Sequence, residues 1–260
     1  MEREIYKKLV EWKDNGSRKP LLLYGARQVG KTFILKEFGK NEFQNMIYVN
    51  CDKNHPVANL FSQNYDINRI LTGLSLIYND KILPGETLIF FDEVQEIPEI
   101  VSSLKYFCEN AAEYCVVAAG SLLGVYDLKE FSFPVGKVDI LHLYPMTFVE
   151  FLKASGEEKK AELIESRGNV DMINNLLPLY IQFLRQYYFV GGMPEAVKKW
   201  IDSKDVAEIR KIQNAIVDGY YADIAKHAGA DATKCRMVLN SIPSQLAKEN
   251  KKFIFGALKK

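Results

Sequence analysis

Residues 20–32 read Pro-Leu-Leu-Leu-Tyr-Gly-Ala-Arg-Gln-Val-Gly-Lys-Thr, an apolar run that leads directly into the pattern G-x-x-x-x-G-K-[ST]. The run predicts a buried strand, and the residues after it predict a helix through 33–38 with Gly39 as its C-cap. A strand that feeds a glycine-rich turn into a helix directs successive backbone N–H groups at one point, where a phosphate fits. The stretch therefore predicts a phosphate-binding loop, with a chance match in a glycine-containing turn as the alternative.

Each residue type in this loop has a chemical reason. Glycine at 25 and 30 permits backbone dihedrals that side chains forbid, Lys31 can reach the β- and γ-phosphates, and the Thr32 hydroxyl can ligate Mg²⁺. The residues expected to bind the nucleotide here are Gly25, Ala26, Arg27, Gln28, Val29, Gly30, Lys31, Thr32 and Phe33.

An acidic pair follows a second apolar run. Residues 87–93 read Thr-Leu-Ile-Phe-Phe-Asp-Glu, which is how a buried parallel strand brings carboxylates to the C-terminal edge of a sheet. We expect Asp92 to hold Mg²⁺ through water and Glu93 to be the base that activates the attacking water, with Lys31 as a catalytic cation. A helix N-cap is the alternative for the acidic pair alone. Together with the upstream loop, the pair predicts a site for a nucleoside triphosphate.

The composition of the 260-residue chain is that of a globular protein, with 48% hydrophobic and 26% charged residues. No apolar stretch is long enough to span a membrane and the start does not resemble a signal peptide, so we expect a cytoplasmic protein without a membrane partner. The four cysteines form no C-x-x-C pair, which favours reduced thiols over disulfides or zinc. The net charge of +1 gives no global argument for nucleic-acid binding.

Strand and helix patterns alternate along the first half of the chain. Helices are predicted over 4–14 and near 67–78, a loop at His55-Pro56, and further strands over 45–51, 114–119 and 138–143. This alternation predicts an α/β fold, a parallel sheet with helices on both faces. After Pro145, helical patterns over 148–153, 159–165, 176–188 and 206–222 predict a helical lid.

One strand pattern separates Lys31 from Asp92, and the strand after Asp92 ends at Gly120-Ser121. This order resembles the branch of P-loop ATPases that inserts a strand between the two motif strands and uses an added glutamate as base. By that resemblance Ser121 occupies the position of sensor 1, which contacts the γ-phosphate or the attacking water. A serine after a strand is also a common helix N-cap.

Four stretches together resemble a single family. They are the loop at 25–32, Phe-Phe-Asp-Glu-Val-Gln-Glu-Ile-Pro at 90–98, Ala-Gly-Ser-Leu-Leu-Gly at 119–124, and Leu-Tyr-Pro-Met-Thr-Phe-Val-Glu-Phe-Leu at 143–152. The family is that of the bacterial and archaeal AAA-type P-loop ATPases whose longer members carry a C-terminal domain of unknown function, often described as nuclease-like. The resemblance covers nearly the whole chain and implies ATP or ADP with Mg²⁺ as ligands.

Gly-Gly-Met-Pro-Glu-Ala at 191–196 resembles the Gly-x-Pro motif of STAND-type signalling ATPases, in which the proline packs on the adenine ring. The resemblance implies that Pro194 contacts adenine. A tight turn between two helices is the alternative.

Two features depart from the family pattern. Pro-Val-Gly-Lys at 134–137 falls where relatives usually show Gly-Arg, so Lys137 keeps the charge but lacks the planar fork that arginine offers to phosphate. Residues 241–260 resemble the start of a winged-helix segment, and we expect either a natural short form or a truncated chain. The expected division is a P-loop ATPase core at 1–147, a helical lid at 148–239 and the truncated start of the winged-helix segment at 240–260.

The favoured function is an ATP-hydrolysing switch that acts on a missing C-terminal domain or an unknown protein partner. The alternative is a nucleotide-locked module that holds ADP with negligible turnover, because no motif selects an arginine finger among Arg185, Arg210 and Arg236. A small-molecule kinase is disfavoured by the aligned acidic pair and by the lack of an arginine-rich lid loop. A nucleic-acid partner rests on the winged-helix resemblance and on lysines that also fit a solvated face: Lys248, Lys251, Lys252, Lys259 and Lys260.

Overall fold

The computed structural model describes residues 1–121, 134–166, 170–249, 252–254 and 256. The chain divides into two compact units, residues 1–209 and 210–260. Leu122, Leu123 and Gly124, from the motif at 119–124, lie outside the described residues, as do Lys251, Lys259 and Lys260.

The first unit is built on a parallel sheet whose strand order is β2-β3-β4-β1-β5. Its strands are β1 (Leu21–Gly25), β2 (Asn45–Asn50), β3 (Thr87–Asp92), β4 (Cys115–Ser121) and β5 (Asp139–Leu143). All of them coincide with strands predicted from apolar runs, so this part of the prediction is confirmed. Strand β4 lies between β1 and β3, which is the inserted-strand order that the resemblance implied.

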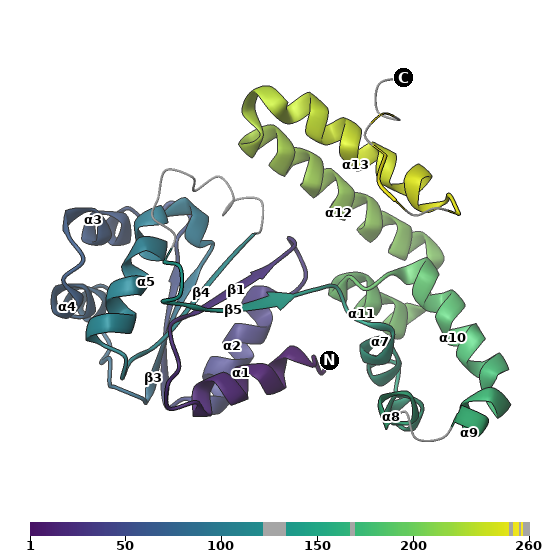
Figure 1. The fold of residues 1–260 in the computed structure, drawn as a ribbon, viewed down its shortest axis with the longest axis horizontal. Coiled ribbons are helices and arrows are strands. Elements are labelled where there is room, and N and C mark those ends of the chain that lie inside the picture. The colour runs from purple at the N-terminus through teal and green to yellow at the C-terminus, as the bar shows by residue number, and fades with distance from the viewer. Residues whose placement is uncertain (122–133, 167–169, 250–251, 255, 257–260) are drawn as a thin grey trace. The chain divides into compact units, whose positions relative to one another are not determined.

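Helices cover both faces of the sheet, as predicted. Leu21 and Leu23 of β1 pack in one apolar cluster with α1 (Ile5–Asp14) and α2 (Lys31–Glu42). Leu22 and Tyr24 point the other way, into a second cluster with α3 (His55–Gln63), α4 (Ile67–Tyr78) and α5 (Pro98–Asn110). Figure 1 shows α3, α4 and α5 grouped on one side of the sheet. The three central strands, β1, β3 and β4, are buried on both faces and therefore read as continuous apolar runs, whereas β2 and β5 at the ends of the strand order alternate between buried and partly exposed positions.

Two local predictions are wrong. Helix α2 does not end at Gly39 but continues to Glu42. A Cβ on Gly39 would lie 2.4 Å from the sulfur of Met46, so this glycine lets α2 approach the sheet and does not cap the helix. The segment at His55-Pro56, predicted as a loop, begins α3, where the Asn54 side chain accepts from the N–H of Val57 and the proline occupies the first turn.

Strand β5 leads into a helical segment that also belongs to the first unit (Figure 1). It consists of α7 (Phe148–Ala154), α8 (Glu158–Ser166), α9 (Val170–Asn175), α10 (Leu177–Val190) and α11 (Pro194–Ser203). Leu152, Ala161 and Tyr180 form its buried apolar centre. The helical patterns predicted over 148–153, 159–165 and 176–188 are therefore confirmed.

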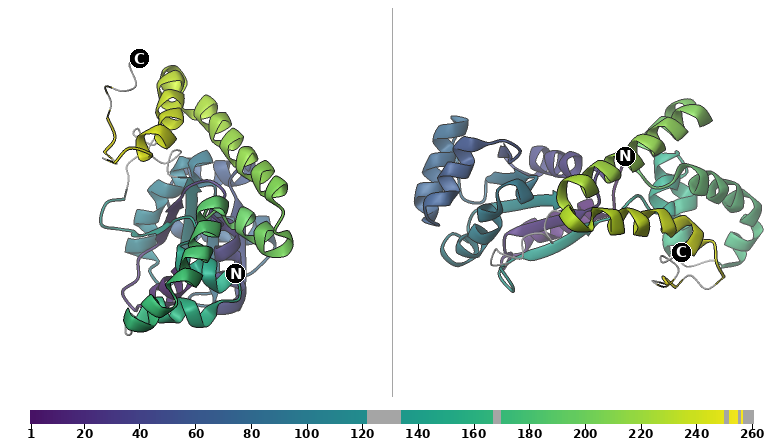
Figure 2. Two further views of the ribbon diagram at one scale, coloured as in Figure 1. Left: turned by 90° about the vertical axis from the view of Figure 1, so that its right-hand side faces the viewer. Right: turned by 90° about the horizontal axis from the view of Figure 1, so that it is seen from above.

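Helix α12 (Val206–His227) runs into the second unit, where α13 (Ala232–Leu246) follows it. Figure 2 shows that the two helices meet at the turn Gly229–Asp231 and diverge from it. The Tyr221 hydroxyl donates a hydrogen bond to Asn240, and the Arg236 guanidinium lies 5.4 Å from the centre of the Tyr221 ring. The predicted boundary at 239/240 falls within α13, and the one at 147/148 falls at the start of α7.

Candidate functional site

The phosphate loop (residues 25–32) connects the buried strand β1 to α2. Gln28 and Gly30 both have positive φ, 64° and 94°, so the backbone turns sharply before α2 begins at Lys31. The Lys31 side chain is buried, and its Nζ donates to the carbonyls of Gly25 and Ala26 at 3.0 and 2.9 Å. The loop therefore closes around a positive charge at a helix N-terminus, where an anion is favoured.

Gly25 is required by the pairing of two strands. A Cβ at this position would lie 2.3 Å from the carbonyl oxygen of Leu143, its partner in β5. No side chain fits at that distance. The first glycine of the motif therefore allows β5 to pass directly beside the beginning of the phosphate loop.

Asp92 ends β3 and is only 3% exposed. Its Oδ2 accepts hydrogen bonds from the hydroxyls of Thr32, at 2.7 Å, and Tyr48, at 3.1 Å. Its Oδ1 accepts from the backbone N–H of Glu93 at 3.1 Å. The two residues predicted to hold Mg²⁺ are thus in direct contact, and hydroxyl and carboxylate oxygens are ligands that Mg²⁺ prefers.

Burial and the charge of Asp92 raise the pKa values of two neighbouring side chains, Tyr48 and Cys51. Burial, and next the charge of Asp92, raises the pKa of Tyr48 from 10.0 to about 12. Burial also raises the pKa of the Cys51 thiol, with Asp92 and Glu93 adding to the effect. Both groups therefore stay neutral at physiological pH, so Tyr48 remains a hydrogen-bond donor to Asp92.

Glu93 follows β3 with a positive φ of 55°. Its Oε2 accepts a hydrogen bond of 2.6 Å from Nε2 of Gln95, in the short 3₁₀ turn Val94–Glu96. The other polar atom of that amide, Oε1 of Gln95, is buried without a hydrogen-bond partner among the described residues. This orientation of the amide gives the Glu93 carboxylate a donor.

Ser121 lies at the C-terminal end of β4, where the sheet register pairs it with Gly25. On the other side of β4, Ala119 pairs with Asp92. Ser121 therefore lies at the same sheet edge as the phosphate loop and the acidic pair. The contact with the γ-phosphate or the attacking water that the resemblance implied for Ser121 stays a prediction.

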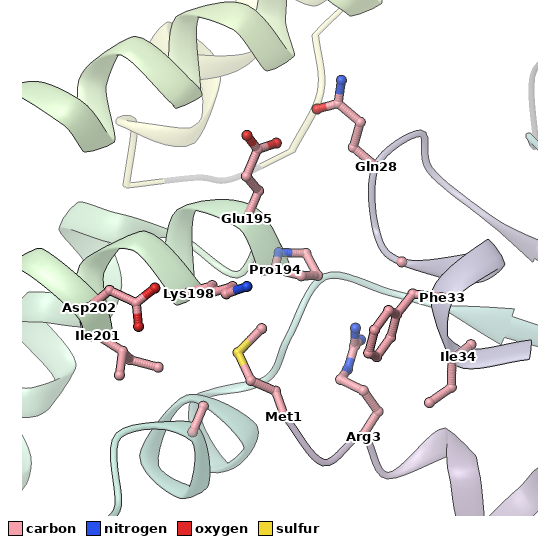
Figure 3. Close-up of a pocket in the computed structure, with 12 residues that line it drawn as sticks. Met1, Arg3, Gln28, Phe33, Ile34, Pro194, Glu195, Lys198, Ile201 and Asp202 are labelled. Atoms are coloured by element: carbon pink, nitrogen blue, oxygen red, sulfur yellow. The ribbon is translucent and has the colours of Figure 1, made fainter. Parts of the chain in front are cut away.

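A pocket of about 590 Å³ lies beside the phosphate loop. Figure 3 shows its lining side chains, which come from the phosphate loop and α2, from α11, and from Met1, Arg3 and Ala154. Its apolar lining includes Phe33, Ile34, Pro194 and Ile201. A Cβ built on Gly30 would be 3.8 Å from Cγ of Pro194, so the predicted adenine contact lies against the phosphate loop.

Lys137, which departs from the family pattern, pairs with a residue outside the site. Its Nζ lies 2.9 Å from Oε1 of Glu109 in α5. This contact raises the pKa of Lys137 and lowers the pKa of Glu109.

Sequence reasoning missed four residues that contact the predicted ones. Tyr48 and Gln95 hold the two acidic side chains, and Arg3 and Glu150 join the phosphate loop to α7. Only Glu150 left a local signal, because Thr-x-x-Glu at 147–150 is a capping box.

Among the described residues, no group of three or more His, Cys, Asp or Glu side chains is arranged to hold a metal ion. A magnesium ion bound through Thr32 and Asp92 would depend on water and nucleotide oxygens for its remaining ligands, which is its usual habit in such sites. None of the described helices is long and apolar enough to cross a membrane.

Comparison with solved structures supports the fold. The Walker-type ATPase PABY2304 of Pyrococcus abyssi is similar at 17% identity, with a TM-score of 0.57 over 95% of this chain and 80% of that one. Lower scores are found for a STAND protein with a tetratricopeptide-repeat sensor, PH0952 of Pyrococcus horikoshii (TM-score 0.46, 13% identity, 82% and 32% of the two chains). AMPPCP-bound DnaA of Aquifex aeolicus gives a TM-score of 0.42 at 15% identity, over 98% and 81% of the two chains.

Comparison with curated proteins finds no match. Residues 181–260 match a domain of unknown function (DUF8612). Residues 17–152 match the AAA domain, over the stretch that contains the phosphate loop, Asp92 and the start of α7. The chain therefore belongs to the AAA domain family of P-loop ATPases.

Proposed function

We propose that this protein is an Mg²⁺-dependent ATPase in which nucleotide turnover changes the conformation of the helical segment. The observation that carries the proposal is the 2.7 Å hydrogen bond between Thr32 and Asp92. Lys31 directly precedes Thr32 in the sequence, and Glu93 directly follows Asp92. A hydroxyl and a carboxylate placed together next to a phosphate loop form the metal side of a phosphoryl-transfer site.

Each residue has a role in this proposal. The phosphate loop and Lys31 bind the phosphates, Thr32 and Asp92 hold Mg²⁺, and Glu93 activates the attacking water. Ser121 contacts the γ-phosphate or that water, from its place beside Gly25. Pro194 and Phe33 enclose the adenine, which suits an apolar pocket next to the loop.

Steady-state ATP hydrolysis over a wide range of protein concentrations tests the proposal. Glu93→Gln should bind ATP but hydrolyse it about 10²- to 10⁴-fold more slowly, the usual effect of losing a general base. Glu96→Gln makes the same chemical change at an exposed neighbour and should keep the parent rate. Equal turnover in the parent and in Glu93→Gln would reject the assignment of the base. A specific activity that rises with concentration would mean that a second subunit completes the site.

A nucleotide-locked module is the second candidate. The close approach of Pro194 to the phosphate loop favours it, because a base held there would keep α11 against the loop. ADP retained through purification, measured by chromatography of the denatured protein, would support this function. Nucleotide-free protein with ready turnover would exclude it.

In either case we propose that the partner is a further domain or another protein. We also propose a cytoplasmic location. The lid is proposed to extend over residues 148–239. Residues 240–260 are proposed as the start of a winged-helix segment. Binding to DNA remains a separate proposal, and DNA affinity that is absent or insensitive to salt would remove it.

A further inference from the structure

Arg3 joins three segments that are far apart in the sequence. It precedes α1 and its side chain is only 8% exposed. Nε donates to Oε1 of Glu150 at 3.0 Å, Nη1 donates to the Val29 carbonyl at 3.1 Å, and Nη2 donates to the Tyr144 carbonyl at 2.6 Å. One guanidinium thus holds the phosphate loop, the connection after β5, and the first turn of α7.

Glu150 is the anionic partner of this contact and is equally buried, with 5% of its side chain exposed. Its Oε1 also accepts from the backbone N–H of Glu4 at 2.9 Å, and its Oε2 accepts from the N–H of Thr147 at 2.8 Å. The carboxylate therefore caps α7 and orients Arg3 at the same time. A buried charge with this many donors has one well-defined position.

The bond to Val29 has a consequence for the phosphate loop. A trans peptide is planar, and its C=O and N–H point in opposite directions. None of the described peptide bonds is cis. Because Arg3 holds the carbonyl of Val29, it also fixes the direction of the N–H of Gly30. Backbone N–H groups of such a loop are the donors that bind phosphate.

The same connection reaches the turn before α11. The N–H of Met146, two residues after Tyr144, donates to the carbonyl of Gly192 at 2.6 Å, and the Tyr187 hydroxyl donates to the Met146 carbonyl at 2.7 Å. The turn that presents Pro194 is therefore bonded to the segment that Arg3 holds.

We propose that Arg3 is a positioning residue that orients the Val29–Gly30 peptide for phosphate binding and couples the phosphate loop to α7. The inference rests on the proposed function in that the ligand is a nucleotide. Arg3 also lines the pocket beside the loop. Its guanidinium donates to the Val29 and Tyr144 carbonyls and to Glu150, so the proposed effect passes through the loop backbone. Loss of Arg3 should therefore weaken every ligand that carries a diphosphate, whether or not a base is attached.

The test compares Arg3→Lys, Arg3→Ala and Glu150→Gln. Lysine keeps the charge but has one nitrogen, so it cannot reproduce donors from three different nitrogens. Lys153→Ala is the matched control, because it removes another ion pair of α7, the 2.7 Å contact with Glu165, which does not touch the loop. Calorimetric titration with Mg-ADP and with Mg-pyrophosphate should show both affinities reduced roughly 10-fold or more in the Arg3 and Glu150 variants. Lys153→Ala should bind both ligands as the parent does.

Hydrogen exchange of the nucleotide-free proteins provides a second readout. Peptides covering 25–33 should exchange faster in the Arg3 variants and in Glu150→Gln than in the parent or in Lys153→Ala. In the parent, ADP should also slow exchange of peptides covering 145–152, and this effect should disappear in Arg3→Ala, because coupling between two sites is reciprocal.

Three results would overturn the proposal. They are parent-like exchange in the Arg3 variants, an unchanged affinity for both ligands, and a loss of ADP affinity with pyrophosphate affinity intact, which would mean that Arg3 acts on the adenine through the pocket that it lines and not through the loop backbone. If the parent bound neither ligand, the proposed function would fail, and the exchange of peptides 25–33 would still decide whether Arg3 holds the loop.

Discussion

The hydroxyl of Thr32 donates a 2.7 Å hydrogen bond to Oδ2 of Asp92, which fastens the first turn of α2 to the end of β3. Strand β4 lies between β1 and β3, so the bond crosses over the end of β4. Lys31, Thr32 and Asp92 consequently meet at one sheet edge, although the last two lie sixty residues apart.

Replacement of Thr32 tests the metal side of the site. Thr32→Val keeps the shape but removes the hydroxyl, so ATP hydrolysis at saturating Mg²⁺ should fall by roughly 10²-fold or more, because the metal contributes several kcal/mol to phosphoryl transfer. Thr32→Ser keeps the hydroxyl and should stay within about tenfold of the parent. The measurement is the rate as a function of Mg²⁺ concentration. Parent-like Mg²⁺ dependence in Thr32→Val would contradict the ligand assignment.

Gln95 holds the proposed base, because its amide donates a 2.6 Å hydrogen bond to Glu93. Gln95→Leu removes this donor at similar size and should lower kcat about tenfold while leaving ADP affinity unchanged, since an oriented base contributes to the transition state alone. Single-turnover hydrolysis and ADP titration separate the two effects. A higher rate in Gln95→Leu would mean that Gln95 restrains Glu93 instead of orienting it.

Stability should fall in alkaline solution. The pKa of Tyr48 rises from 10.0 to about 12 in the folded protein, and that of Cys51 is raised as well. The unfolded chain therefore releases these protons first, so the stabilisation is complete below about pH 9 and is lost as pH rises towards 12. Thermal unfolding between pH 7 and 11.5 measures this loss. Tyr48→Phe should show a shallower decline above pH 10, and an identical decline would contradict the assignment to Tyr48.

Pro194 should affect the binding of the adenine and not the binding of the phosphates. Its ring lies beside the phosphate loop in an apolar pocket. Pro194→Ala should weaken ADP about 3- to 10-fold, because part of the apolar contact with the base is lost. Pyrophosphate, which has no base, should bind this variant as it binds the parent. Equal weakening of both ligands would show that Pro194 supports the loop instead.

Gly192 allows the turn before α11 to pack against the connection after β5. A Cβ at this position would lie 2.4 Å from the carbonyl oxygen of Met146, a backbone atom that cannot move aside. Gly192→Ala should destabilise the protein by about 1–3 kcal/mol, measured by urea unfolding. Gly16→Ala is the control, because nothing lies within 4 Å of its Cβ position, and it should change stability by no more than about 1 kcal/mol. Equal stabilities of the two variants would mean that the turn shifts freely.

The sequence by itself determined the strands, the phosphate loop and the acidic pair. A strand buried on both faces is a continuous apolar run, and the loop motif is a contiguous pattern whose residues act on one another locally. Prediction from neighbouring residues failed where one residue type occurs in two kinds of local structure. Gly39 resembles a helix C-cap, but it lies within α2 because the helix approaches Met46 there. His55-Pro56 resembles a loop, but the proline occupies the first turn of α3.

Only the tertiary structure decided which side chains hold the predicted ones in place. Tyr48 reaches Asp92 because β2 and β3 are neighbours in register, and Arg3 reaches Glu150 across 147 positions of sequence. Such contacts leave no periodic or contiguous pattern, because they depend on strand order and on how β5 carries the chain from the sheet into α7. The sequence determined the groups that the site would use, and long-range packing decided their neighbours and orientation.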